Sequence, residues 1–175
     1  MRLFIGIAFE ETVKRQIAEI QEQIRPKIEC ANFTYPDNFH LTISFIGETD
    51  RISDIRKLAK EISERHATFS IEITKAGSFR KGNREIIWVG SHPEKRLTAL
   101  AADMAQTLTE NGFSVDTRPI VPHITLAREA VVTDKSETIF VPIKVEADSL
   151  TLFHSTRVNG KLTYLPLYRW PLAGK

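Results

Sequence analysis

Two short segments of this chain each place a histidine two residues before a threonine: HLTISF from His40 and HITLAR from His123. Both are rich in β-branched and apolar residues, which predicts strands. Residues two apart in a strand point to the same face, so we expect His40 beside Thr42 and His123 beside Thr125. Imidazoles exchange protons near neutral pH and hydroxyls donate hydrogen bonds to phosphate oxygens. The two pairs together therefore favour acid–base chemistry on a phosphate.

Either motif alone has an ordinary structural explanation. A histidine in a strand is often half-buried and hydrogen-bonded, and threonine is a common strand residue. Two copies on two expected strands are much less frequent by chance. The repetition, rather than either motif, favours the catalytic interpretation.

The motifs belong to a pattern that recurs along the chain. His40 and His123 lie 83 residues apart in a chain of 175, and an apolar strand-like run begins 37 residues before each of them, at Leu3–Ala8 and at Ile86–Val89. One segment with a single apolar helical stripe lies between run and motif in each half, Glu11–Ile24 and Glu94–Glu110. Such stripes predict helices packed on a sheet.

The second parts of the two halves match less well. The first half continues with an expected helix, Arg51–His66, and an alternating strand, Phe69–Thr74. The matching segment of the second half, Thr133–Thr138, has room for one helical turn at most. The chain then closes with two strand-like segments, Lys144–Phe153 and Tyr164–Leu172, on either side of Asn159-Gly160. Asn-Gly is a strong turn signal, although its neighbours favour a longer loop.

These elements predict an α+β fold. We expect one bilobal domain over residues 1–175, with pseudo-repeats at roughly 1–80 and 84–175. Two pseudo-symmetric, mostly antiparallel sheets with flanking helices should enclose a central cleft. His40 and His123 should face that cleft from inner strands.

Composition indicates a compact globular chain, with 42% hydrophobic and 26% charged residues. No run approaches the ~20 apolar residues of a membrane span, and the short apolar start gives no signal-peptide pattern. Cys30 is the single cysteine, which fits a reducing cytoplasm. The net charge of +2 is too small to indicate nucleic-acid binding. Locally, however, Arg80, Lys81 and Arg84 crowd one loop, either as a solvated hairpin tip or as a polyanion patch.

The paired motifs resemble the 2H phosphoesterase superfamily. The chain is similar to its branch of bacterial and archaeal RNA 2′,3′-cyclic phosphodiesterases, historically called 2′-5′ RNA ligases. The similar segments are RLFIGIAF, FTYPDNFHLTISFIGE, GSFRKGNREIIWVG, VPHITLAR and LTLFHSTRVNGKLTYLPLYRWPL. Phe33 stands where many members have tryptophan, and Ser44 replaces a more usual small or basic residue. Both departures bear on substrate preference rather than on chemistry.

The resemblance implies a division of roles. By resemblance to this superfamily, His123 is expected to be the general base and His40 the general acid, and Thr42 and Thr125 are expected to bind the phosphate. The substrate is an RNA with a 2′,3′-cyclic phosphate end or a cyclic nucleotide, the product is a 2′-phosphate, and no cofactor or metal takes part. From the residues alone, the near-symmetric motifs allow either histidine to be the acid. We expect a cytoplasmic monomer without membrane attachment.

Arg128 poses a geometric problem. Strict alternation points His123 and Thr125 to one face and Arg128 to the other. The resemblance implies that Arg128 binds phosphate, which requires the strand to end or bulge near Ala127. We expect the nearby aromatic residues Phe79 and Trp88 to be core rather than base-stacking residues.

Three alternatives stay open at this point. A zinc site would use the histidines as ligands, but no third ligand recurs at matching places in both halves, and full activity in EDTA would exclude it. A non-catalytic nucleotide- or RNA-binding module would keep the fold without turnover. A 2H enzyme could also act on another phosphodiester, such as a small metabolite.

Overall fold

The structure is a computed structural model and describes residues 1–174. It contains the strands β1 (Arg2–Ala8), β2 (Ile28–Phe33), β3 (His40–Glu48), β4 (Phe69–Ile73), β5 (Lys75–Lys81), β6 (Arg84–Gly90), β7 (His123–Val132), β8 (Ile143–Ala147), β9 (Ser149–Val158) and β10 (Lys161–Pro171). Its helices are α1 (Glu11–Ile24), α2 (Ile52–Arg65) and α3 (Lys95–Glu110), with single 3₁₀ turns η1 (Arg25–Lys27) and η2 (Pro36–Asn38). Within these residues no helix is both long enough and apolar enough to cross a membrane.

The strands form two four-stranded sheets, in the orders β10-β9-β1-β3 and β2-β7-β6-β5, and a two-stranded sheet, β4-β8. All pairings between the named strands are antiparallel. The predicted α+β class with mostly antiparallel sheets is therefore confirmed. The halves of the chain are interleaved, because each large sheet combines strands from both.

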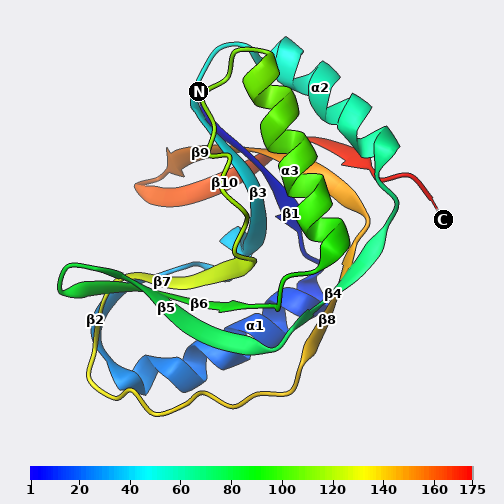
Figure 1. Cartoon of the computed structure of the whole chain (residues 1–175). Helices are drawn as coiled ribbons and strands as arrows, with labels where there is room; N and C mark the ends of the chain where they lie inside the picture. The colour runs from blue at the N-terminus through cyan, green and yellow to red at the C-terminus, as the bar shows by residue number, and fades with distance from the viewer. Residues whose placement is uncertain (175) are drawn as a thin grey trace.

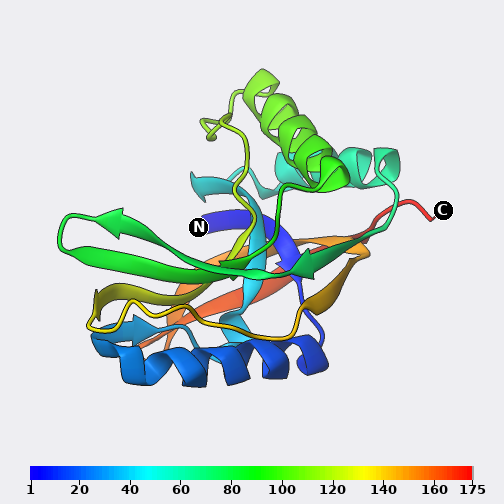
Figure 2. The ribbon, with the colours of Figure 1, turned by 60° about the horizontal axis from the view of Figure 1, so that its bottom comes forward.

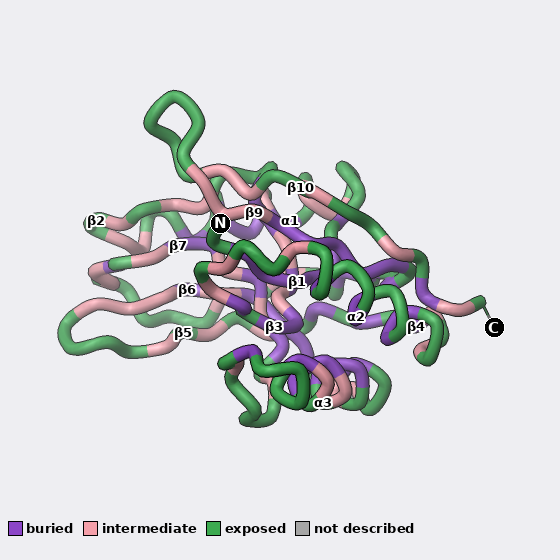
Figure 3. The backbone as a smooth tube through the Cα atoms, turned by 90° about the horizontal axis from the view of Figure 1, so that it is seen from above, coloured by how far each residue is buried: buried purple, intermediate pink, exposed green. Residues whose placement is uncertain are grey.

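The helices cover the sheets from opposite sides (Figure 1). Helix α1 buries Ile17, Ile20 and Ile24 and runs beneath the β2-β7-β6-β5 sheet (Figure 2). Helices α2 and α3 contact each other and pack on the other large sheet, at β9, β10 and β3. Their predicted apolar stripes are the buried faces, as the alternation of purple and green along α3 shows (Figure 3). One continuous apolar core links the layers.

Two strands escape detection in the sequence because they lie at sheet edges. Strand β2 carries Glu29, Cys30 and Asn32 among half-exposed positions, and β5 (KAGSFRK) is mostly polar. Neither has a continuous apolar face, so neither shows a clear period of two. The segment expected as one strand from Lys144 is also divided at Asp148 into β8 and β9, which join different sheets.

The closing turn is tighter than expected. Val158 pairs directly with Lys161, so Asn159 and Gly160 form a two-residue turn and the expectation of a longer loop is wrong. Both residues have positive φ, 49° and 79°, as a type I′ hairpin requires. Residues 133–138 form no helix; the Lys27 amine instead donates hydrogen bonds to the carbonyls of Ser136 and Glu137.

Candidate active site

The structure brings the strands of the two motifs together. Strand β7 lies inside its sheet, but β3 is an edge of the other large sheet, so the expectation that both histidines stand on inner strands is wrong for His40. Cα atoms of the two strands approach within 8 Å. They meet near the middle of the molecule (Figure 1). Thr42 from β3 and His123 from β7 line one cavity of about 650 Å³. Residues from both motifs therefore face a shared space.

His40 is held by its own strand and by the chain just before it. Its Nδ1 lies 2.6 Å from the Asn38 carbonyl oxygen, and its Nε2 lies 2.9 Å from the Thr42 hydroxyl. Its ring packs at 4.7 Å from Phe4 and meets Tyr164 edge-on at 5.0 Å. The contact with Thr42 confirms that these two side chains project together.

His123 has the matching contacts in the other half. Its Nδ1 lies 2.7 Å from the carbonyl oxygen of Val121, again two residues earlier. The Phe79 ring meets it edge-on at 5.0 Å, and the Trp88 ring lies at 6.4 Å. Both aromatic residues are half-buried beside the histidine and outside the core, so the expectation that they are core residues is wrong.

The carbonyl contacts fix the tautomer of both rings. A carbonyl oxygen can only accept, so each Nδ1 carries a hydrogen and donates it. Each Nε2 is then the atom that takes up or releases a proton. In the neutral ring of His40, the Thr42 hydroxyl donates to this atom.

Both motif strands bulge at the same place. Strand β1 pairs Ile5 with Ser44 but Gly6 with Thr42, so Ile43 is an extra residue in β3. Strand β6 pairs Ile87 with Ala127 but Trp88 with Thr125, so Leu126 is the extra residue in β7. Each bulge comes three residues after the histidine. At the bulge two successive side chains face the core, so every later side chain of the strand points to the opposite face from the one that strict alternation would give.

The bulge in β7 resolves the problem of Arg128. Leu126 and Ala127 are both buried, and Arg128 is half-buried and lines a cavity next to the histidines. In β3 the same shift buries Ile43 and Ser44 and places Phe45 at the corresponding position, with 57% of its surface exposed. One motif thus presents a cation and the other an aromatic ring.

The two histidines differ in electrostatic environment. Burial lowers the pKa of His40 to about 4, an effect that its bond to Asn38 opposes and that the charges of Arg128 and His123 reinforce. Burial also lowers the pKa of His123, with a further contribution from Arg128. Because Arg128 acts on both rings and His123 acts on His40, the charges of the three side chains are coupled.

Two cavities lie beside the histidine pair. The first, already described, is lined by Thr42, Phe45, Phe79 and His123. The second has a volume of about 790 Å³ and extends from Arg128 to the β9–β10 turn. We call them the aromatic cavity and the hairpin cavity.

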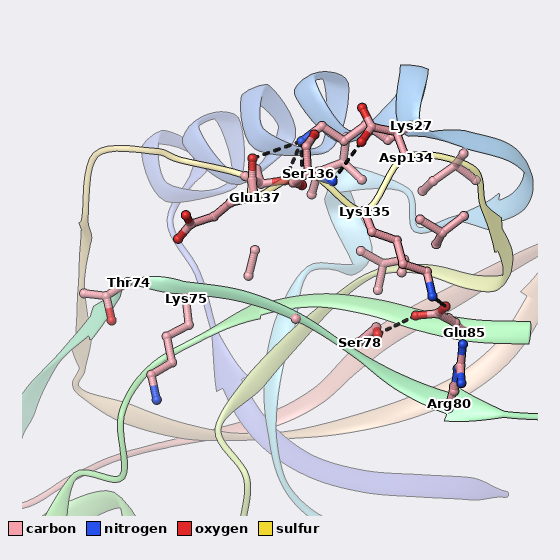
Figure 4. Close-up of a pocket in the computed structure, with 17 residues that line it drawn as sticks. Lys27, Thr74, Lys75, Ser78, Arg80, Glu85, Asp134, Lys135, Ser136 and Glu137 are labelled. Carbon is pink, nitrogen blue, oxygen red and sulfur yellow. Dashed lines mark hydrogen bonds and ion pairs between the residues drawn. The ribbon is translucent and has the colours of Figure 1, made fainter.

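A third cavity, of about 580 Å³, contains none of the motif residues. It lies between β5 and the 133–138 segment, where Arg80 stands beside Glu85 and Ser78 (Figure 4). The basic cluster expected from the sequence is therefore divided. Arg84 donates hydrogen bonds toward Cys30 Sγ and the Glu129 carbonyl, and alternation points Lys81 away from Arg80.

No group of three or more His, Cys, Asp or Glu side chains within residues 1–174 is placed to hold a metal ion. The sequence indicates the four motif residues and Arg128 as candidate site residues, and the structure adds three neighbours: Phe45 in the aromatic cavity, and Asn38 and Tyr164 beside His40. Phe45 could have been found by aligning the two motifs, because it occupies the same position after His40 as Arg128 does after His123. Asn38 lies two residues before His40, whereas Tyr164 reaches that ring only through the fold.

Comparison with known proteins agrees with this geometry. A sequence model of the 2′-5′ RNA ligase superfamily matches residues 9–159. The RNA 2′,3′-cyclic phosphodiesterase of Thermotoga maritima is 32% identical over 183 residues, covering 99% of this chain and 97% of the relative. The Escherichia coli protein of the same name is 29% identical over 179 residues, covering 98% and 96%. The crystal structure of E. coli LigT complexed with 3′-AMP matches with a TM-score of 0.84 and 27% identity, covering 98% of this chain and 97% of that one.

Proposed function

This chain belongs to the 2′-5′ RNA ligase superfamily, and on that basis we propose that it opens 2′,3′-cyclic phosphates, on RNA ends or nucleotides, by two-histidine acid–base catalysis. The observation that carries the mechanism is the matched pair of motif strands. Each begins with a histidine whose Nδ1 donates to the carbonyl two residues earlier, and together the strands supply Thr42 and His123 to one cavity. Because both motifs come from one chain, a monomer is sufficient for activity.

In the proposed reaction, His123 Nε2 takes a proton from the attacking water, and the oxygen of that water bonds to phosphorus. The bond from phosphorus to the ribose O3′ breaks, and His40 Nε2 supplies the proton to the leaving oxygen. The product is a 2′-phosphate. Thr42, Thr125 and Arg128 bind the non-bridging oxygens, on which negative charge increases in the transition state. The assignment of His40 as the acid follows the family resemblance.

The lowered pKa of His40 gives substrate binding a specific role. With a pKa of about 4, protonating His40 at pH 7 costs roughly 4 kcal/mol, because each pH unit corresponds to about 1.4 kcal/mol. A phosphate anion about 4 Å away contributes about 4 kcal/mol of attraction at an effective dielectric constant of 20. The two terms are of equal size. The bound cyclic phosphate therefore offsets the cost of protonating His40.

The aromatic cavity suits the base of the terminal nucleotide. Its Phe45 ring is exposed, and its lining also includes the small residues Ala101 and Ala105. An exposed ring offers a face on which any base can stack. We place the base there and the phosphate between the histidines.

The test is product analysis by phosphorus NMR with 2′,3′-cyclic AMP in the presence of EDTA. We expect turnover to a 2′-phosphate, and a loss of at least ~10²-fold in rate for His40→Ala and for His123→Ala. Thr42→Ala and Thr125→Ala should cost less, because each removes one neutral donor. A 3′-phosphate product would reverse the roles of the histidines, loss of activity in EDTA would indicate a metal, and binding without turnover would leave a passive binding module.

A further inference from the structure

We propose that the hairpin cavity binds the RNA strand on the 5′ side of the cyclic phosphate, with Arg157 and Lys161 of the β9–β10 turn contacting its internucleotide phosphates. This inference rests on the proposed function and extends it from the reacting ring to the rest of the substrate. It predicts a preference for RNA ends over mononucleotides, and it names the residues responsible.

The hairpin cavity begins at the catalytic pair. Asn38, whose carbonyl accepts the hydrogen bond from His40, is one of its lining residues. So is Tyr164, whose ring meets that of His40 at 5.0 Å. Arg128, which acts electrostatically on both histidines, also lines it. A strand attached to a phosphate between the histidines therefore has direct access to this cavity.

The charges of the cavity suit a polyanion, because its lining holds four cations (Arg25, Arg128, Arg157 and Lys161) against two carboxylates (Glu22 and Glu129). Arg157 and Lys161 make no ion pair with a carboxylate anywhere in residues 1–174: Arg157 donates to the Gly160 carbonyl, and Lys161 lies over the Tyr35 ring at 5.3 Å. Arg25, by contrast, is neutralised by a two-pronged bond to Glu22. With Arg128, two cations of the turn thus remain available for phosphates.

The aromatic cavity offers no such charge. The ions that line it, Asp116 and Arg118, are paired with each other at 2.6 Å. A base gains from the exposed Phe45 ring on that side, whereas a chain of phosphates gains from the cations on the other. The contrast between the cavities therefore decides the direction in which the strand leaves the site.

The turn holds its cations in place and provides a stacking surface. Asn159 and Gly160 fix a two-residue hairpin, and the bond from Arg157 to the Gly160 carbonyl holds the guanidinium against it at 2.8 Å. Tyr35 also lines the cavity, is 49% exposed, and has the Lys161 amine over its ring. Cations beside an exposed ring are the usual means of binding a single strand without reading its sequence.

The experiment compares kcat/KM for three substrates: 2′,3′-cyclic AMP, a dinucleotide and a pentanucleotide RNA, the last two ending in a 2′,3′-cyclic phosphate. Each is measured at 50 and 200 mM salt with the wild type, Arg157→Gln, Lys161→Gln and the double variant. Arg80→Gln is the matched control, because it removes one arginine charge from the third cavity, which contains none of the motif residues.

We expect the wild type to have a higher kcat/KM for the dinucleotide, which has one internucleotide phosphate, and for the pentanucleotide than for 2′,3′-cyclic AMP. Each phosphate contact should add a salt-dependent loss of roughly 2.5-fold between 50 and 200 mM, from a slope of about −0.7 per phosphate on a single strand. The double variant should lose most of the RNA preference and its salt dependence, with 2′,3′-cyclic AMP turnover within about twofold of the wild type. Arg80→Gln should behave as the wild type.

Two results would overturn the inference: unchanged RNA preference in the double variant, or an equal loss on RNA and on the mononucleotide. A wild type that fails to hydrolyse 2′,3′-cyclic AMP and both RNAs would instead refute the proposed function. The two failures are therefore distinguishable.

Discussion

The two histidines show how the same residue acquires different properties from its surroundings. Both rings donate from Nδ1 to the carbonyl two residues earlier, which leaves Nε2 as the atom that exchanges a proton. His40 is enclosed by Phe4, Phe153 and Tyr164, whereas His123 meets Phe79 and Trp88 from one side. Burial therefore lowers the pKa of His40 further below the ordinary value of 6.5, to about 4.

The first prediction at this scale concerns the pH dependence of catalysis. The active form carries one proton on the histidine pair, so kcat/KM should be bell-shaped, with both limbs belonging to the coupled pair. Because both pKa values lie below 6.5 in the free protein, kcat/KM should fall about tenfold per unit between pH 7 and pH 8. The bound phosphate raises both values, so the kcat profile should lie on the alkaline side. A flat kcat/KM from pH 6 to pH 8 would contradict this.

The second prediction concerns stability and the same side chain. The unfolded chain takes up a proton on His40 near pH 6.5, while the folded protein resists until about pH 4. The stability that His40 confers is therefore complete above pH 6.5 and declines as the pH falls, by up to roughly 3 kcal/mol at pH 4. Denaturant unfolding should show that the free energy of unfolding falls more steeply between pH 6.5 and pH 4 in the wild type than in His40→Gln. The exposed His92→Gln is the matched control and should keep the wild-type pH dependence.

At the scale of elements, the bulges decide which side chains reach the site. Without the extra residue Leu126, alternation would point Arg128 away from the histidines. Helix α1 holds this bulge in place, because the buried Gln21 amide donates to the carbonyls of Leu126 and Thr34, both at 2.8 Å. A helix from the first half of the chain thus supports the strand of the second half that carries Arg128.

Replacing that amide should affect both stability and binding. Gln21→Leu keeps most of the side-chain volume but leaves the Thr34 carbonyl without the donor it has now, which should cost about 1–3 kcal/mol of unfolding free energy. If the bulge relaxes, Arg128 moves, and KM should rise more than kcat falls. Gln106→Leu, on the exposed face of α3, is the control. A destabilised Gln21→Leu variant with wild-type KM would limit Gln21 to a purely structural role.

The sequence predicts elements well where one face is apolar. The stripes of α1, α2 and α3 and the alternation of β4 each need only local information. The pairing of His40 with Thr42 also follows from strand geometry alone. The bulges at Ile43 and Leu126 could not be located, because each depends on the register with a partner strand, β1 or β6.

At the scale of the whole molecule, the two motifs carry nearly the same chemical groups, but the elements around them differ. The sheets interleave the halves, so the β9–β10 hairpin lies beside β1 and near His40, while the β5–β6 hairpin lies beside β7 and near His123. This exchange could not be read from the repeat in the sequence. It produces one cationic cavity and one aromatic cavity on either side of a matched pair of histidines.

The symmetry yields a final prediction about the orientation of the substrate. Phe45 and Arg128 occupy equivalent places, each five residues after its histidine and just past a bulge. If they orient the nucleotide, Arg128→Phe alone should weaken turnover, because it removes a phosphate contact. Adding Phe45→Arg then places a cation in the aromatic cavity, while the ring introduced at position 128 offers the base a stacking surface near His40. The double variant should then bind part of its substrate reversed and release a mixture of 2′- and 3′-phosphates from 2′,3′-cyclic AMP, measurable by phosphorus NMR. A double variant that stays active and forms only the 2′-phosphate would show that orientation is set by residues beyond this pair, with the unpaired cations of the β9–β10 turn as the next to replace.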